Sequence, residues 1–186
     1  MKLDDVSLAA ETPADDAEIL NLHEQAFGPG RFARAAERVR EQGPHARELS
    51  FTARHEGRLV GSVRMTPVRI GGVAGHMLGP LAVTPQAKRN GIGGALIALA
   101  CRAAAEADGA FVLLVGDEPY YGRHGFARVE GPVMPGPVDP HRLLVRWHGA
   151  EVALDGHVRH AARNGADGMP AGDGVGAYQE KRNVTP

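Results

Sequence analysis

The chain has 186 residues, which favours a single domain large enough to bury a hydrophobic core. Its 21 basic and 22 acidic residues give a formal net charge of −1, so no broad basic face is expected and nucleic-acid binding is disfavoured. No apolar run approaches the roughly 20 residues of a membrane-spanning helix, and the acidic N-terminus lacks a signal-peptide pattern. Cys101 is the single cysteine, which excludes an internal disulfide and a cysteine-rich metal site. We therefore expect a cytoplasmic protein without a bound metal or a membrane partner.

Two helices are predicted near the N-terminus, after a short strand over residues 6–11. Apolar residues at helical spacing predict the first helix over residues 13–27, where Thr12 and Pro13 form a typical helix start. The second helix is expected over residues 32–41. Its arginines alternate with glutamates, which we interpret as a solvated, salt-bridged face in preference to an anion site.

From residue 48 the apolar period changes to two, which predicts an antiparallel meander. Turns at Glu56-Gly57 and Gly71-Gly72 separate its strands, and the last strand covers residues 73–83. Gly79-Pro80 lies within that strand. Because proline cannot donate to a ladder and glycine tolerates unusual backbone angles, the pair suggests a bulge. Such a break is either an opening where a ligand pairs with free strand groups, or an edge distortion without chemical use.

The second half of the chain predicts a parallel crossover followed by shorter elements. An alanine-rich helix runs to about residue 108, and the strand over residues 111–115 is apolar throughout and so buried on both faces. A short helix and further strands follow over residues 120–124, 126–129 and 143–147. We expect one domain over residues 1–150. Residues 151–186 would form a C-terminal extension that could add a short strand or turn at 157–162 and is Gly/Ala-rich and mobile after about residue 163.

A glycine-rich turn, Gly91-Ile92-Gly93-Gly94, joins the strand of Gly79-Pro80 to the long helix. Free N–H groups and the positive end of the helix dipole at such a point suit a phosphate-bearing ligand. Leu96 stands where a dinucleotide-binding fingerprint has its third glycine, and Gly94-Ala95 does not supply the Gly-Lys-Ser/Thr of a P-loop. Both nucleotide interpretations therefore fail, and close helix–sheet packing remains an alternative to a phosphate site.

Two segments carry a family resemblance. Residues 88–93, KRNGIG, are similar to an Arg/Gln-x-x-Gly-x-Gly/Ala signature for acetyl-CoA, and residues 120–126, YYGRHGF, to an aromatic-Tyr-x-x-x-Gly-Phe segment. With the elements around them, residues 5–150 resemble the GNAT acetyltransferase superfamily, and LGPLAV at 78–83 is most similar to a bacterial subgroup of predicted N-acetyltransferases. Lys88 stands where the family usually has Arg or Gln. The family holds the pyrophosphate mostly with backbone N–H groups, so this difference affects one side-chain contact and leaves the expected site in place. The implied fold is mixed α/β (α+β), with a mostly antiparallel sheet splayed between strands 4 and 5 and about four flanking helices.

The resemblance implies an acetyl-CoA-dependent N-acetyltransferase, an acyltransferase that moves acetyl directly to a primary amine of a small molecule, peptide or protein. Strand backbone groups would pair with the pantetheine arm, and N–H groups at the helix start would hold the pyrophosphate. The implied cofactor-binding residues are Leu81, Ala82, Val83, Lys88, Arg89, Asn90, Gly91, Ile92, Gly93 and Gly94. A catalytically silent CoA-binding sensor or regulatory module is the alternative. The amine acceptor is not identified, and a homodimer is possible.

Tyr121 matches the family position of the general acid that protonates the leaving CoA thiolate, whereas Tyr120 is expected to be a packing aromatic. The N–H of Leu81 would polarise the thioester carbonyl. The sequence does not single out the general base that deprotonates the amine. His76 is a candidate because its ordinary pKa near 6.5 suits the task. The alternatives are a water chain or one of three acidic residues, namely Asp117, Glu118 and Glu24.

Overall fold

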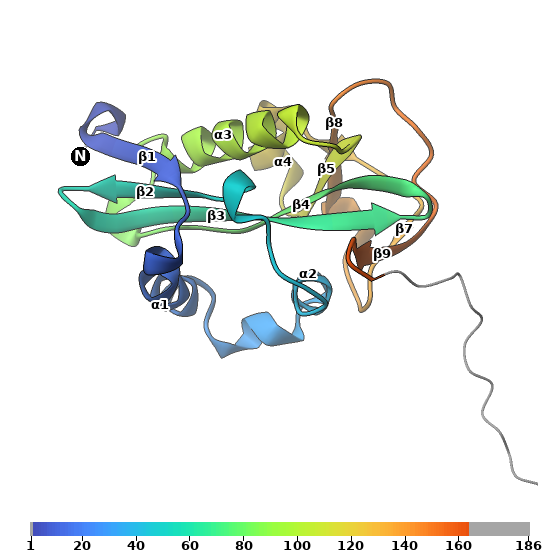
Figure 1. Cartoon of the computed structure of the whole chain (residues 1–186), viewed down its shortest axis with the longest axis horizontal. Helices are drawn as coiled ribbons and strands as arrows, with labels where there is room; N and C mark the ends of the chain where they lie inside the picture. Colours follow the sequence, from blue (N-terminus) through green and yellow to red (C-terminus); the bar gives the residue numbers. More distant parts are fainter. Residues whose placement is uncertain (1, 164–186) are drawn as a thin grey trace, which may run out of the picture.

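The computed structural model describes residues 2–163 (Figure 1). The segment predicted to be mobile after about residue 163 lies outside the described residues. The helices are α1 (Asp16–Phe27), α2 (Ala35–Arg40), α3 (Ile92–Glu106) and α4 (Glu118–Tyr121). The strands are β1 (Val6–Ala10), β2 (Phe51–His55), β3 (Arg58–Ile70), β4 (Val73–Val83), β5 (Phe111–Val115), β6 (Ala127–Arg128), β7 (Pro132–Val133), β8 (Leu143–Trp147) and β9 (Gly156–His160).

The sheet is mixed and mostly antiparallel, as the sequence predicts. Its order is β1-β2-β3-β4-β5-β8-β6, with β9 pairing to β3 and to β7. Along the main path, β4 and β5 are the parallel pair, because α3 provides the crossover between them. Figure 1 shows α1 and α2 on one face of the sheet and α3 and α4 on the other. Because helices cover both faces of the sheet, a ligand can reach the sheet backbone at its edges and at breaks between strands.

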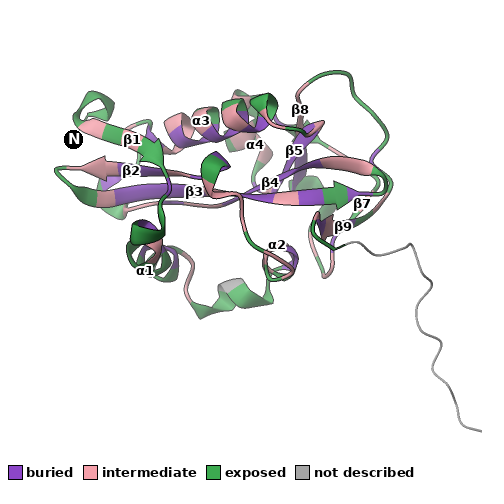
Figure 2. Cartoon of the chain, viewed as in Figure 1, coloured by how far each residue is buried: buried purple, intermediate pink, exposed green. Residues whose placement is uncertain are grey.

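The central strands are buried on both faces (Figure 2). On the face covered by α3, Val112 and Leu114 of β5 join one apolar cluster, whereas Phe111 and Leu113 join a second cluster that includes Val39 of α2. This alternation explains why the sequence of β5 is apolar at every position. It also fixes β5 firmly between two layers, so that its C-terminal end is a rigid boundary for the neighbouring site.

The strands β4 and β5 separate soon after they meet. Their paired residues are His76 with Val112 and Met77 with Leu113. Beyond Leu78, β4 continues along β3 alone. The register between β3 and β4 shifts between Val63 and Met65, so that Gly79-Pro80 opposes the single residue Arg64. The predicted bulge is confirmed, and it lies where the sheet opens.

Two expectations for the local structure can be compared with the described elements, and the first of them needs revision. The helix expected over residues 32–41 is a 3-10 turn at Pro29–Ala33 followed by α2, because Arg34 adopts an extended backbone conformation between them. The short strand or turn expected at 157–162 is the strand β9, one residue earlier at its start, and it pairs with Val68–Ile70 of β3; the division of the chain at residue 150 stays a prediction. Among residues 2–163, no helix has the length and apolar character needed to cross a membrane.

A buried ion-pair cluster ties the end of β1 to α1 and β3. The Glu11 side chain is 0% exposed and accepts hydrogen bonds from Arg64 at 2.8 and 3.0 Å and from Arg47 at 2.8 Å. His45 Nε2 lies 2.8 Å from the same carboxylate, and Arg64 also contacts Asp16 at 2.8 Å. Burial acts to raise the pKa of Glu11, but the bonds from His45 and Arg64 outweigh it and the pKa is lowered. The cluster holds Arg64 opposite the bulge.

Candidate active site

A cavity of about 430 Å³ opens where β4 and β5 diverge. Its walls come from the bulge of β4, the end of β5, the helix α2, and the segments around Tyr121 and Arg142. The bulge contributes Leu78, Gly79, Pro80 and Leu81, β5 contributes Leu114 and Val115, and α2 contributes Glu37 and Arg40. A second cavity of about 210 Å³ shares Glu37, Arg40, Gly79 and Pro80 with the first and extends beneath α1. The two cavities therefore abut at the bulge, and one ligand can approach from each side.

The free edge of β4 faces the larger cavity. Thr84 N–H donates to Val60 O of β3 at 2.9 Å, and residues on an antiparallel strand alternate in the direction of their hydrogen bonds. Ala82 and Thr84 therefore direct their backbone groups towards β3. Leu81 and Val83 direct theirs to the opposite edge, which β5 has left. This arrangement agrees with the prediction that Leu81 and Val83 pair with an extended ligand, and Ala82 then serves the ladder.

The N-terminus of α3 lies beyond the end of β4. Gly91 is its N-cap with φ +79°, and no side chain caps the helix. Because Ala95 N–H donates to Gly91 O at 2.9 Å, the three N–H groups before it, from Ile92 to Gly94, precede the first helical bond. Lys88 and Arg89 are exposed in the preceding turn. The arrangement is a phosphate cradle built from backbone, and its use for a pyrophosphate stays a prediction.

Tyr121 lies at the larger cavity, at the C-terminal end of α4. Burial raises its pKa to about 12, with the nearby Tyr120 and Asp117 adding to the shift and Arg142 and Arg40 opposing it. The phenol is therefore protonated at neutral pH and can donate into the cavity. Its ring stands edge-on to Tyr120, with the ring centroids 4.9 Å apart. Tyr120 itself is 41% exposed and is not part of the cavity wall.

The position of the Tyr121 ring depends on Gly116. A methyl group at Gly116 would overlap the ring of Tyr121, because the ring packs directly against the Gly116 backbone. We expect Gly116→Ala to displace the phenol and to lower turnover about 10- to 100-fold, in line with the cost of misplacing a reacting group by an ångström. Gly122→Ala is the matched control, because a methyl group there meets nothing within 4 Å. Steady-state kinetics of both variants provide the test, and equal turnover would contradict this role of Gly116.

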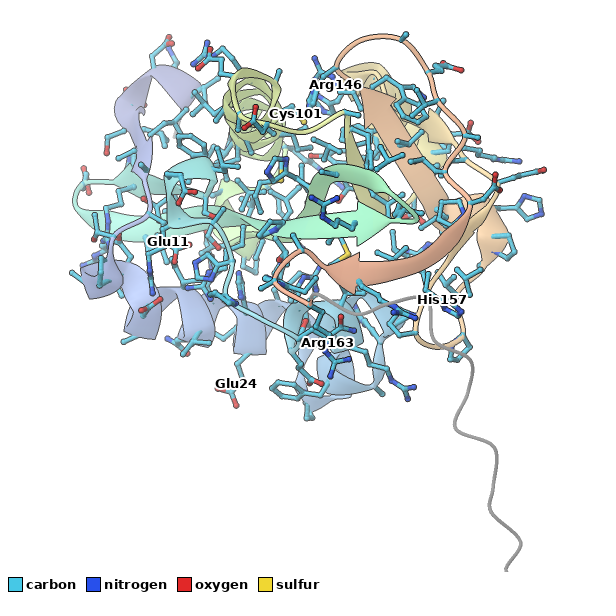
Figure 3. All side chains as sticks on the ribbon, turned by 45° about the vertical axis from the view of Figure 1, so that its right-hand side comes forward. Glu11, Glu24, Cys101, Arg146, His157 and Arg163 are labelled. Carbon is cyan, nitrogen blue, oxygen red and sulfur yellow. The ribbon has the colours of Figure 1, made fainter. Side chains whose placement is uncertain are left out.

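The structure does not bring His76 to this site. The His76 side chain is 5% exposed on the paired part of β4 and does not line either cavity. Burial and the charge of His148 lower its pKa. Glu24 is exposed and points away from the sheet (Figure 3). Asp117 and Glu118 pair with Arg142 at 3.1 Å and with Arg128 at 2.7 Å. The geometry therefore supports none of these residues as the base.

Sequence reasoning missed the polar residues that line the smaller cavity. Arg64 and Thr66 of β3, His23 of α1 and the pair Glu37–Arg40 of α2 all contribute. The face of β3 opposite Val63 and Met65 carries Ser62, Arg64 and Thr66, and α1 covers it; His23 Nε2 lies 3.0 Å from Ser62 Oγ. One signal was available, namely the length of β3. The strand has 13 residues and is buried on both faces, whereas a strand of a half-exposed meander is usually shorter and buried on one face.

The single cysteine lies in the core, away from the larger cavity. Cys101 is buried on α3, burial raises its pKa, and Arg146 lies beside it (Figure 3). It is therefore a packing residue and not a nucleophile. Within residues 2–163, no group of three or more His, Cys, Asp or Glu side chains is placed to hold a metal ion.

The structure is thus a mixed α/β fold in which the sheet opens beyond the paired part of β4 and β5, next to a free edge of β4 and an uncapped N-terminus of α3. A family model described as an acetyltransferase (GNAT) domain matches residues 46–128. The uncharacterized N-acetyltransferase YjhQ of Escherichia coli K12 is 30% identical over 159 residues, which are 80% of this chain and 88% of that protein. The chain therefore belongs to the GNAT N-acetyltransferase family.

Solved structures agree with this assignment. The GNAT family N-acetyltransferase YhbS from Escherichia coli, in complex with CoA, superposes with a TM-score of 0.70 at 23% identity, over 83% of this chain and 89% of that chain. A GNAT family acetyltransferase from Brucella melitensis, in complex with acetyl-CoA, gives a TM-score of 0.63 at 28% identity, over 84% of this chain and 96% of that chain. The fold expected from the sequence is confirmed, whereas the predicted subgroup stays a prediction.

Proposed function

We propose that the protein is an acetyl-CoA-dependent N-acetyltransferase that transfers acetyl directly to a primary amine of a small molecule, peptide or protein. The observation that carries this proposal is that Tyr121, the free backbone groups of Leu81 and the end of β5 meet at one cavity. The acetyl-CoA and CoA bound to the two structural relatives support the choice of cosubstrate. The expected cytoplasmic localisation and possible homodimer remain predictions.

Acetyl-CoA would lie along the edge that β4 presents to the opening. The pantetheine arm pairs with Leu81 and Val83 as an added strand, and the pyrophosphate accepts hydrogen bonds from the N–H groups of residues 92–94 at the positive end of the α3 dipole. A Cβ at Gly93 would stand 2.7 Å from Tyr120 Oη. Glycine at this position therefore lets the Tyr120 hydroxyl pack against the start of the helix.

The reaction needs an oxyanion donor and a proton donor. The amine nitrogen attacks the thioester carbonyl carbon, and the carbonyl oxygen takes the electron pair of its π bond. Leu81 N–H stabilises that oxyanion. When the intermediate collapses, the C–S bond breaks and the thiolate takes the phenolic proton of Tyr121. The attacking nitrogen loses its proton, Tyr121 regains one, and the products are an N-acetyl amine and CoA thiol.

The amine must lose its ammonium proton before it attacks. The carboxylates at the larger cavity belong to Glu37 and Asp139, and His23 and His45 line the smaller cavity. These side chains, or water between them, are the groups in position to accept the proton. The water chain was among the candidates that the sequence suggests, whereas none of these four side chains was.

Release of CoA thiol from acetyl-CoA, measured with a panel of primary amines, tests this function. We expect thiol release that depends on the amine and saturates with acetyl-CoA. Binding is followed separately by thermal unfolding, because a ligand at 100 times its Kd adds about 2.7 kcal/mol of stability. Stabilisation by CoA without thiol release from any amine would favour the silent sensor. Equal stabilisation by ATP would contradict the CoA site itself.

A further inference from the structure

One ion pair of α2 stands where the two cavities abut. Arg40 Nη1 donates to Glu37 Oε2 at 2.9 Å, and the two side chains are 19% and 17% exposed. Both residues line both cavities, together with Gly79 and Pro80 of the bulge. The sequence suggested a solvated arginine face for this helix. The structure instead holds one of its arginines largely out of water, beside the reacting end of the site.

Arg40 has hydrogen-bonding capacity that residues 2–163 do not use. Its Nε atom is buried without a hydrogen-bond partner. A guanidinium has five N–H donors, and the edge formed by Nε and Nη2 is the one that Glu37 leaves open. Nη2 lies 2.8 Å from the position that a Cβ of Gly79 would occupy. A buried cationic donor without a partner is unfavourable, which makes an additional, anionic partner the simplest explanation.

The other arginines around the cavities have a charged partner or are exposed to solvent. Arg142 Nε lies 3.1 Å from Asp117, and the guanidinium of Arg34 lies 5.6 Å from the centroid of the Phe27 ring. Arg64 is held by the buried carboxylate cluster around Glu11. Among the described residues that line the cavities, Arg40 is therefore the arginine with a buried nitrogen that has no hydrogen-bond partner.

We propose that the acceptor is a small amine that also carries a carboxylate, and that Arg40 binds this carboxylate. The proposal rests on the proposed function and deepens it. The planar carboxylate matches the Nε–Nη2 edge of the guanidinium in a two-bond geometry, which lysine cannot reproduce. Glu37, next to Arg40, supplies the opposite charge for the ammonium group. Cavities of about 430 and 210 Å³ suit an amino-acid-sized molecule.

The test compares the common α-amino acids with their carboxamides as acceptors. Each pair differs at the carboxylate, and kcat/KM is measured for wild type, Arg40→Gln, Arg40→Lys and Arg38→Gln. Because the amine pKa also changes between acid and amide, the ratio of the two kcat/KM values is compared between variants. Arg38 lies on the same helix, is exposed and donates to Pro135 O, so it is the matched control.

We expect wild type and Arg38→Gln to prefer the acid about 10- to 100-fold, the range for hydrogen bonds to a charged group. Arg40→Gln should abolish that preference mainly through KM, and Arg40→Lys should retain part of it. A wild-type enzyme that accepts the carboxamides equally well, or an unchanged ratio in Arg40→Gln, would overturn the proposal. If Arg40→Gln does not fold, the ratio in Arg40→Lys is compared with that in wild type and Arg38→Gln, and an unchanged ratio in Arg40→Lys would then overturn the proposal.

Binding measurements keep the two proposals separate. With CoA present, an α-amino acid should raise the unfolding temperature of wild type more than its carboxamide does, and Arg40→Gln should remove the difference. Such a difference without turnover would contradict the acetyltransferase function while supporting the acceptor class. Turnover of amines without any preference for a carboxylate would support the function and overturn the acceptor class.

Discussion

Replacing Tyr121 by phenylalanine should lower kcat about 10²- to 10⁴-fold, the range for loss of a general acid, and leave the binding of acetyl-CoA nearly unchanged. The phenol lines the cavity, and burial raises its pKa to about 12, so it carries its proton across the physiological pH range. Phenylalanine preserves the packing of the ring against Phe126 and removes only the donor. Thiol release under saturating acetyl-CoA measures kcat, and calorimetric titration measures binding.

Tyr120→Phe is the comparison that makes this experiment specific. It removes the same hydroxyl from the neighbouring residue, which is 41% exposed and lies outside the cavity wall. We expect it to keep most of the turnover. If both variants lose activity equally, or if Tyr121→Phe remains fully active, the thiolate receives its proton from another group and the assignment of Tyr121 fails.

Glu11→Ala should destabilise the fold by about 3–5 kcal/mol, the range for removing one partner from a buried ion pair. The Glu11 carboxylate is 0% exposed and receives hydrogen bonds from Arg64 and Arg47, whose charges would lose this partner. Denaturant unfolding monitored by circular dichroism gives the free energy of unfolding. Glu106→Gln, on the exposed face of α3, is the control and should shift it by less than about 0.5 kcal/mol. A loss of comparable size in both variants would contradict the role of the cluster.

The same cluster predicts how stability depends on pH. The pKa of Glu11 is lowered from its ordinary value of 4.5, so its contribution is fully present above that value and is lost as the pH falls through the lower, native pKa. The neighbouring Asp15 and Asp16 have lowered pKa values for the same kind of reason and add to the effect. Unfolding free energies measured from pH 7 down to pH 3 should therefore fall, and fall less steeply in Glu11→Gln. An identical slope in the variant would contradict this explanation.

The parts of the fold that follow from local chemistry were predictable. The residues of β4, β5 and β8 are those that the apolar patterns and turn residues predict. The break at Gly79-Pro80 was also readable, because these residue types disturb a ladder wherever they occur. Tyr121 was predicted from the family segment alone, and the structure adds that it reaches the cavity.

The parts that depend on distant packing were not predictable. Arg40 reads as one of several arginines on a short helix, and only the placement of α2 against the bulge removes it from water. Arg64 similarly reads as a solvent-facing residue of an alternating strand, until α1 and Glu11 cover it. His76 has a suitable pKa in isolation, but the pairing of β4 with β5 buries it away from the cavity. In each case the sequence gives the chemistry of the side chain, but the residues that surround it come from elements distant in the chain and cannot be read from the local pattern.

Amide NMR during titration with acetyl-CoA tests the central claim most directly. We predict that the N–H signals of Leu81, Val83, Gly93 and Gly94 shift and become protected from hydrogen exchange, whereas Ala82, whose N–H serves the ladder to β3, changes little. Perturbation confined to other parts of the chain, or no response to acetyl-CoA at all, would contradict the assignment of the opening between β4 and β5 as the acetyl-CoA site.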